Sequence, residues 1–337
     1  MALRDIKSQE IAVKFLRAFL RQKEIRACSF LFFGPEGVGK AYAAKNFIKA
    51  LNCEAQNGES CDRCASCVEI QHKVTADILW IKPETPEGSI SIDAIRRVQY
   101  LMSLKAYTAK KKVFVCEHAH QLTPEAQDSL LKILEEPQRD SVFLLISSKP
   151  YLLKATMLSR CQKVRFNAIN RMSVREILAG EGTLEERDLA FISDFSCGSL
   201  GEAKRYARLG IFSKKNRVLD YLLSEHAKHT FLERVERLQE LYKKENSRLP
   251  EQEEMLEFKD IMRILLSFFR DVIMVKIGEK TGLINFDRVV DLERFSGVHT
   301  FDELDKKVHL LMQLEDVLSQ NANEEIAFLN IFREILN

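Results

Sequence analysis

One short segment constrains the fold of this chain more than any other: an apolar run, a glycine-rich turn and a helix-forming stretch follow one another directly. The apolar run Ser29–Phe33 has the length of a buried strand, and residues 41–51 are rich in helix formers. Between them lies Gly34-Pro35-Glu36-Gly37-Val38-Gly39-Lys40. Glycines let a backbone turn its N–H groups around a phosphate, and a lysine meets the phosphate charge. The segment therefore predicts a phosphate-binding loop in an α/β fold.

Two positions that would complete a nucleotide-hydrolysing site are changed. A loop that supports hydrolysis continues with Ser or Thr, whose hydroxyl holds Mg²⁺, but this chain has Ala41. The later strand should end in an Asp that orients the metal and a Glu that activates water, and here it ends in Glu117 and His118. The loop therefore indicates the fold and argues against hydrolysis. Whether it still holds ATP or ADP is left open.

Further apolar runs alternate with helical patterns over residues 1–166. The runs of strand length are 77–81, 113–116, 142–146 and 163–166, and the helical patterns are 90–104 and 124–136. Thr123 is a predicted N-cap with Pro124 at the first helical position, and Pro137 must end that helix. Strands that alternate with helices predict a parallel sheet covered by helices on both faces.

After about Phe166 the pattern is helical throughout. Helix-length segments in residues 167–208 are broken by glycines at 180, 182, 198 and 201, and residues 209–337 are predicted as an all-α domain. The long helical stretches of that domain are 229–244, 254–278 and 301–336 with breaks. The apolar part of the second stretch is typical of a helix buried in a bundle or at a subunit interface.

Composition excludes a chain embedded in a membrane or largely disordered. Apolar residues make up 46% and charged residues 30% of the chain, as in soluble globular proteins. The apolar runs are far shorter than the ~18 residues of a membrane span, and no stretch resembles a signal peptide, so a cytoplasmic protein is expected.

Charge is unevenly distributed along the chain. Residues 1–166 contain 26 Lys and Arg against 18 Asp and Glu, and residues 167–337 contain 25 against 31. The first half could face a polyanion, or the imbalance could be spread over its surface without consequence.

Four of the eight cysteines, Cys53, Cys61, Cys64 and Cys67, are closely spaced. A C-x2-C spacing lets a turn present two thiolates to one ion, and four thiolates close a tetrahedral zinc sphere without room for a catalytic water. The spacing predicts a structural Zn²⁺ module over residues 53–67. Reactive or incidental thiols are the alternative, since a disulfide set would require an oxidising compartment.

Five segments taken in order resemble a known family. They are GPEGVGKA at 34–41, the four-cysteine insert, the segment Ser91–Arg96, the segment Leu130–Pro137, and Ser159-Arg160-Cys161. They resemble the AAA+ subunits of the bacterial DNA polymerase III clamp loader, densely from about Ile6 to Phe166 and more thinly beyond.

The resemblance implies a domain organisation. It implies an α/β P-loop AAA+ domain over 1–166 with a parallel sheet and a small zinc-binding insert, a helical lid over 167–208, and an all-α C-terminal collar domain over 209–337 that serves oligomerisation.

Departures from the family pattern indicate which type of subunit this is. The motor subunits (gamma/tau) combine the hydroxyl after the lysine, an Asp-Glu pair and an arginine in a Gly-Ser-x-Arg motif. This chain has Ala41, a degenerate Walker B residue Glu117 followed by His118, and Gly201 at the arginine position. Three degraded parts of one ATPase site resemble the delta-prime type, which in this family is a non-hydrolysing member of a five-subunit ring.

The same resemblance gives Arg160 a role. It implies an arginine finger that reaches in trans into the ATP site of the adjacent motor subunit. A guanidinium that neutralises charge on the γ-phosphate accelerates other nucleotide hydrolases by ~10³–10⁵-fold. The alternative is an arginine at a strand entrance in a surface ion pair, worth under ~1 kcal/mol.

The resemblance also implies partners. These are the motor (gamma/tau) and delta subunits, the sliding clamp indirectly, and primer–template DNA through contacts to its backbone. Two other functions stay open on the sequence: a self-sufficient ATPase motor of gamma/tau type, and a zinc-bearing nucleic-acid adaptor whose loop is vestigial.

Overall fold

The computed structural model describes residues 2–22, 24, 27–55, 58–72, 75–85, 88–107, 109–137, 140–182, 184–223 and 255–318. The chain divides into two compact units. One comprises Met1–Val174 with Gly198–Gly201, and the other comprises Arg175–Cys197 with Glu202–Asn337. The three domains that the sequence predicts, with boundaries after residues 166 and 208, stay predictions.

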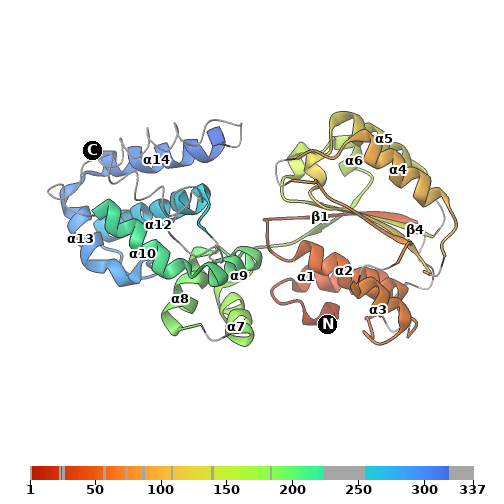
Figure 1. Cartoon of the computed structure of the whole chain (residues 1–337), viewed down its shortest axis with the longest axis horizontal. Helices are drawn as coiled ribbons and strands as arrows, with labels where there is room; N and C mark the ends of the chain where they lie inside the picture. Colours follow the sequence, from red (N-terminus) through yellow and green to blue (C-terminus); the bar gives the residue numbers. More distant parts are fainter. Residues whose placement is uncertain are drawn as a thin grey trace. The chain divides into compact units, whose positions relative to one another are not determined.

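The first unit is built on one five-stranded sheet whose neighbouring strands all run parallel (Figure 1). In chain order the strands are β1 (Cys28–Phe33), β2 (Ile78–Ile81), β3 (Lys112–Cys116), β4 (Ser141–Ser147) and β5 (Gln162–Arg165). Their order across the sheet is β2-β3-β4-β1-β5, so β1 lies between β4 and β5. The predicted parallel sheet is confirmed, with each predicted strand present within about one residue of its expected bounds.

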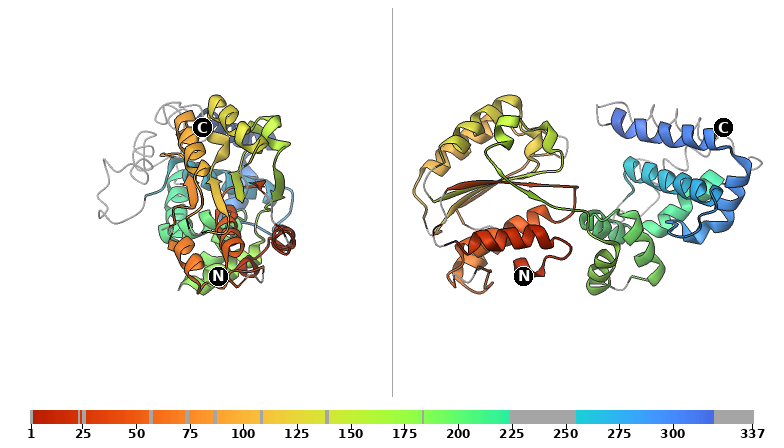
Figure 2. Two further views of the ribbon diagram at one scale, coloured as in Figure 1. Left: turned by 90° about the vertical axis from the view of Figure 1, so that its right-hand side faces the viewer. Right: turned by 180° about the vertical axis from the view of Figure 1, so that it is seen from behind.

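Helices cover both faces of this sheet (Figures 1 and 2). On one face lie α1 (Glu10–Leu20), α2 (Lys40–Asn52) and α3 (Ala65–His72), and on the other lie α4 (Ile92–Ser103), α5 (Pro124–Glu135) and α6 (Ala155–Leu158). The 3-10 helices of this unit are Leu3–Asp5, Ala119–Gln121 and Pro150–Leu152. This is the layering that right-handed crossovers between parallel strands produce.

Each face of the sheet has its own aromatic core. On the side of α1 and α2, the ring of Phe30 meets those of Phe19 and Phe47 edge to face, with centroids 4.9 and 5.4 Å apart. Beneath α4 and α5, the rings of Phe114 and Phe143 lie 6.0 Å apart. Burial of large aromatic side chains contributes strongly to stability, so these contacts fix β1 and its neighbours.

The predicted ends of α5 are confirmed. Thr123 Oγ1 accepts the backbone N–H of Ala126 at 3.2 Å, and Pro124 is the first residue of the helix. The helix ends at Glu135, two residues before Pro137. Proline disfavours helical backbone at the residue before it, so Pro137 explains why α5 ends at Glu135.

Sequence analysis does not predict α1 or α3. In α1 the buried residues Ala12, Val13, Leu16 and Phe19 follow helical spacing, so a signal was present. In α3 there are only eight residues, and their apolar side chains show no clear stripe. Cys67 lies in this helix, whereas the C-x2-C spacing of Cys64 and Cys67 predicts a tight turn there.

After β5 the described part of the chain contains helices and no strand. They are α7 (Arg171–Glu181), α8 (Glu186–Phe195), α9 (Leu200–Leu209), α10 (Ile211–Leu223), α12 (Phe258–Lys276), the 3-10 helix Phe286–Arg288, α13 (Val289–Val298) and α14 (Phe301–Leu318). None of the described helices is long and apolar enough to cross a membrane. Gly182 follows α7 and Gly198 lies between α8 and α9, where breaks are predicted. Gly180 and Gly201 lie at the ends of helices, as the next-to-last residue of α7 and the second residue of α9.

The apolar helix α12 lies in the core of the second unit. Its residues Phe268 and Phe269 are fully buried, and their rings lie 5.5 and 6.3 Å from that of Phe295 in α13. The prediction of a buried bundle helix is confirmed. The predicted stretch 229–244 and the end of the stretch 301–336 lie outside the described residues.

Candidate functional site

The carboxyl ends of parallel strands lie at one edge of a sheet. The predicted phosphate loop and the degenerate Walker B residue both lie at this edge. Phe33, the last residue of β1, pairs with Ser147 at the end of β4. Cys116, the last residue of β3, pairs with Leu145. Glu117 follows directly, so it leaves the sheet at the same edge as the loop.

Glycine is required in the loop by its backbone. Gly34, Gly37 and Gly39 have φ of 142°, 72° and 93°, where other residues are strained. A Cβ on Gly34 would overlap the carbonyl oxygen of Phe166, which follows β5. The loop is therefore packed against the end of the neighbouring strand.

The loop lysine is directed at the loop itself. Lys40 is 7% exposed, and its Nζ donates to the carbonyl oxygen of Gly34 at 2.7 Å and to that of Pro35. Burial lowers the pKa of Lys40 to about 8, and the charge of Glu36 partly opposes this shift. In a triphosphate-binding loop the lysine at this position contacts the phosphates. In this chain the Lys40 ammonium contacts two backbone carbonyl groups of the loop.

The segment Gly198–Gly201 closes over the same loop within the first unit. The N–H of Gly201 donates to the carbonyl oxygen of Gly37 at 3.0 Å. A Cβ on Gly37 would overlap Ser199 Oγ, and a Cβ on Gly201 would lie 3.2 Å from Gly37 Cα. The position that carries an arginine in motor subunits is therefore occupied by a glycine in direct contact with the loop.

One histidine, His118, replaces part of the expected acidic pair, and a second, His120, follows it. His118 has φ of 53° and directly precedes the 3-10 helix Ala119–Gln121, and His120 Nδ1 lies 3.2 Å from Ser147 Oγ. The pKa of His120 is lowered to about 4 by burial and then by the charges of His118 and Lys149, while Glu36 opposes the shift. At neutral pH His120 is thus an uncharged hydrogen-bonding partner of Ser147.

Arg160 is held on a rigid base at the opposite edge of the sheet. It follows α6 and precedes β5, and its backbone N–H donates to the carbonyl oxygen of Met157 at 3.1 Å. Both Met157 and the next residue, Cys161, are buried in the core beneath α5. The Arg160 side chain is 36% exposed, so a fixed backbone presents a partly exposed guanidinium.

The guanidinium of Arg160 has two close polar partners. Nη2 lies 2.7 Å from Glu135 Oε1, and Nη1 donates to the carbonyl oxygen of Thr156 at 2.9 Å. This is the surface ion pair that the alternative interpretation of Arg160 expects. An exposed pair of this kind contributes at most ~1 kcal/mol and can exchange one anionic partner for another.

Arg160 cannot act on the loop of its own chain. Gln162 lies opposite Phe30 in the parallel pair of β5 and β1, which puts Arg160 level with Cys28, before the start of the loop at Gly34. At ~3.3 Å per residue that separation is about 20 Å along the strands. An arginine side chain does not span it, so Arg160 does not reach the loop of its own chain.

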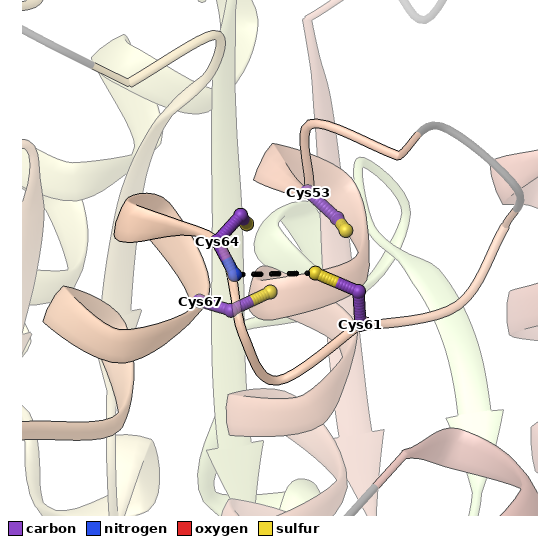
Figure 3. Close-up of side chains that lie close together, drawn as sticks. All are labelled: Cys53, Cys61, Cys64 and Cys67. Carbon is purple, nitrogen blue, oxygen red and sulfur yellow. Dashed lines mark hydrogen bonds between the residues drawn. The ribbon is translucent and has the colours of Figure 1, made fainter.

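The four closely spaced cysteines form one cluster (Figure 3). Cys53 follows the end of α2, Cys61 and Cys64 lie in the loop after it, and Cys67 lies in α3. Their four Sγ atoms lie within 4.8 Å of one another, and all four thiols are free. The predicted set of ligand residues is therefore brought together.

The geometry fits a tetrahedral zinc ion. Zinc–sulfur bonds of ~2.3 Å place the sulfurs of a tetrahedron about 3.8 Å apart, which the upper limit of 4.8 Å in this cluster allows. The N–H groups of Arg63 and Cys64 lower the pKa of Cys61 to about 6, the Cys64 donor lying 3.3 Å from the sulfur. Such donors stabilise a thiolate, the form that binds metal. The identity of the ion stays a prediction, and its role would be to link α2 to α3.

Glu135 lies in a segment that carries the resemblance, Leu130–Pro137, and Ser199 lies at the Gly-Ser-x-Arg motif, but sequence reasoning gave neither residue a role. Their contacts join segments that are distant in the chain, and motif spacing does not reveal such contacts. A carboxylate in the last turn of α5 was a weak signal, because negative charge is unfavourable at a helix C-terminus without a compensating cation.

Comparison with known proteins assigns the family. A model described as "DNA polymerase III, delta subunit" matches residues 8–170, and one described as "DNA polymerase III, delta subunit, C terminal" matches residues 227–335. The chain belongs to the DNA polymerase III clamp-loader family. The parallel sheet covered by helices and the helical second unit confirm the predicted α/β domain and the predicted helical C-terminal part.

Curated relatives of this clamp-loader chain carry two types of name. DNA polymerase III subunit delta' of Bacillus subtilis is 25% identical over 305 residues, 90% of this chain and 88% of the relative. DNA polymerase III subunit delta' of Pseudomonas aeruginosa is 33% identical over 136 residues, 40% of this chain and 42% of the relative. Subunit tau of Bacillus subtilis is 32% identical over 205 residues, and the match spans 59% of this chain but only 36% of that relative.

One solved structure aligns over nearly the whole chain. It is a DNA polymerase III gamma subunit-related protein of Thermotoga maritima, 20% identical, with a TM-score of 0.48 and coverage of 95% of this chain and 97% of that one.

The cysteine cluster yields a prediction about metal content. Purified protein should contain one zinc ion per chain, and Cys64→Ser should lose it because three thiolates hold zinc more weakly than four. Elemental analysis by mass spectrometry measures this directly. The exposed Cys197 lies outside the cluster, so Cys197→Ser is the matched control and should keep the ion. Wild-type protein purified without chelators and free of zinc would contradict the prediction.

His120 yields a prediction about pH. Its pKa is about 4 in the folded chain and 6.5 in the unfolded chain, so the unfolded chain binds more protons between these values. The contribution of neutral His120 is therefore complete above about pH 6.5 and is lost as pH falls towards 4. Urea midpoints measured from pH 7.5 to 5 should decline more steeply for wild type than for His120→Gln. Parallel declines would contradict this assignment.

Proposed function

We propose that this chain is a non-hydrolysing, delta-prime-like subunit of the clamp loader. In this role it contributes Arg160 in trans to the ATP site of the neighbouring motor subunit while the sliding clamp is loaded on primed DNA. The observation that carries the proposal is the separation of the two parts of an ATPase site. The glycine loop follows β1 at one edge of the sheet, and Arg160, whose neighbours Met157 and Cys161 are buried, precedes β5 at the other.

Several features of the loop support the absence of hydrolysis. Ala41 offers no hydroxyl for Mg²⁺, and Lys40 already donates to two loop carbonyls. Gly201 brings backbone rather than a guanidinium to the loop. Without these charges and ligands, charge that develops on a γ-phosphate has little to stabilise it.

The form of the Arg160 segment supports action in trans. A finger residue requires a backbone that does not move and a head group that another molecule can reach. The buried neighbours Met157 and Cys161 supply the first property, and the exposure of the guanidinium supplies the second. The contacts with Glu135 and Thr156 do not use all five N–H donors of the guanidinium, so donors stay available for a phosphate.

This role defines partners and location. The chain would work in the cytoplasm beside a motor (gamma/tau) subunit and a delta subunit, and would reach the sliding clamp only through the assembled ring. Contacts to primer–template DNA would be to its backbone, which the surplus of basic residues in 1–166 favours.

A gamma/tau-like motor is the second candidate, and one observation favours it. The chain is 32% identical to the Bacillus subtilis tau subunit over 205 residues, and it keeps the glycines and lysine of the loop. A motor must hydrolyse ATP through that loop, so the two candidates differ in which residue their activity requires.

The proposed function yields a prediction about Arg160. In a loader reconstituted with motor and delta subunits, Arg160→Ala should lower DNA-stimulated ATP turnover at the shared site at least ~10-fold, because the charge that neutralises the γ-phosphate is lost. Phosphate release measures this turnover. Arg165 is also an exposed arginine and is the last residue of β5, the strand that follows Arg160. Arg165→Ala is therefore the control and should retain activity. Equal turnover for wild type and Arg160→Ala would refute the proposal.

The proposed function also yields a prediction about Lys40. Lys40→Met should leave turnover of the reconstituted loader within about twofold of wild type, because this loop does not hydrolyse ATP. A thermal melt confirms that the variant folds despite losing two hydrogen bonds. Strong loss of turnover in a folded Lys40→Met loader, or brisk hydrolysis by the purified chain alone, would instead favour the motor.

A further inference from the structure

The last residue of α5 makes the closest charged contact of Arg160. Glu135 Oε1 lies 2.7 Å from Nη2, while Nη1 is held by the carbonyl oxygen of Thr156 at 2.9 Å. The two acceptors come from different elements, α5 and α6. Together they restrain the guanidinium from two directions on the surface of the first unit.

Stability does not account for this carboxylate. Glu135 and Arg160 are 42% and 36% exposed, and exposed ion pairs stabilise proteins little. Negative charge in the last turn of a helix is also opposed by the helix dipole. Glu135 thus occupies an unfavourable position, and its contact is with Arg160.

We propose that Glu135 is the positioning residue for Arg160. It holds the guanidinium in one orientation at the subunit surface. The entropy cost of orienting the side chain is therefore met before the arginine reaches the partner's γ-phosphate. This inference rests on the proposed function of Arg160. Glu135 itself touches neither nucleotide nor reacting atoms.

The chemistry of the two groups makes such positioning effective. A guanidinium is planar and carries five N–H donors, so two fixed contacts define its plane and leave other donors for phosphate. Orientation that is already present before the transition state lowers the barrier of the chemical step. The proposed contact acts on charge that develops on the γ-phosphate in the transition state, so kcat should fall while the KM for ATP stays unchanged.

The test compares two neighbouring carboxylates in the reconstituted loader. Glu135→Gln should lower kcat for DNA-stimulated ATP hydrolysis about three- to fivefold with unchanged KM, because an exposed ion pair is worth at most a factor of that size. Glu136 is exposed and lies just beyond the helix, so Glu136→Gln removes the same charge and should behave as wild type. Gel filtration of each variant confirms assembly of the loader.

A double variant shows whether Glu135 acts through Arg160. If it does, Arg160→Ala with Glu135→Gln should be no slower than Arg160→Ala alone. A further loss in the double variant would overturn the inference. So would equal losses for the Glu135 and Glu136 variants, or a faster Glu135→Gln loader, which would mean that the carboxylate competes with phosphate.

The outcomes separate this inference from the proposal beneath it. A strong effect of Arg160→Ala with normal turnover for Glu135→Gln would reject the positioning role alone. No effect of Arg160→Ala would reject the proposed function, and the positioning role with it.

Discussion

The burial of strand β1 between two parallel neighbours is the constraint on which the rest of this molecule depends. It pairs with β4 on one side and β5 on the other, and Phe30 anchors it against α1 and α2. Because all strands run in one direction, whatever follows β1 and whatever precedes β5 must lie at opposite edges. The glycine loop is at the first edge and Arg160 at the second. A phosphate-binding loop and an arginine of one chain are thereby kept apart, and only an assembly of chains could bring such groups together.

At the edge that carries the loop, the groups that would meet a nucleotide have found partners within the protein. Lys40 donates to loop carbonyls, Gly37 accepts from Gly201, and His120 pairs with Ser147. These hydrogen bonds satisfy polar groups that are buried or half-buried at this edge, as buried polar groups require. At the other edge the contacts of Arg160 are partly exposed, so its ion pair contributes little to stability.

The cysteine module is tied to the same framework through α2. Helix α2 begins at Lys40 and ends at Asn52, directly before Cys53. Lys49 of this helix pairs with Asp62 at 2.6 Å, and Lys110 Nζ donates to the carbonyl oxygen of Cys53 at 2.7 Å. The module is therefore fixed to the first unit by ion pairs and hydrogen bonds as well as by its cysteines. Its place at the far end of α2 from the loop agrees with a structural role.

The sequence by itself determined the strands, the loop, the ends of α5 and the four cysteines. These depend on local properties: apolar runs, φ values that only glycine adopts readily, an N-cap followed by proline, and thiols at short spacing. Only the tertiary structure decided that Gly201 lies against Gly37 of the loop, that Lys40 turns to its own loop, and that Glu135 pairs with Arg160. Each of these joins groups through space, and the free energy of such a contact depends on a partner whose position no local pattern encodes. The distance between the loop and Arg160 belongs to the same class, because strand order across a sheet is set by packing and not by order along the chain.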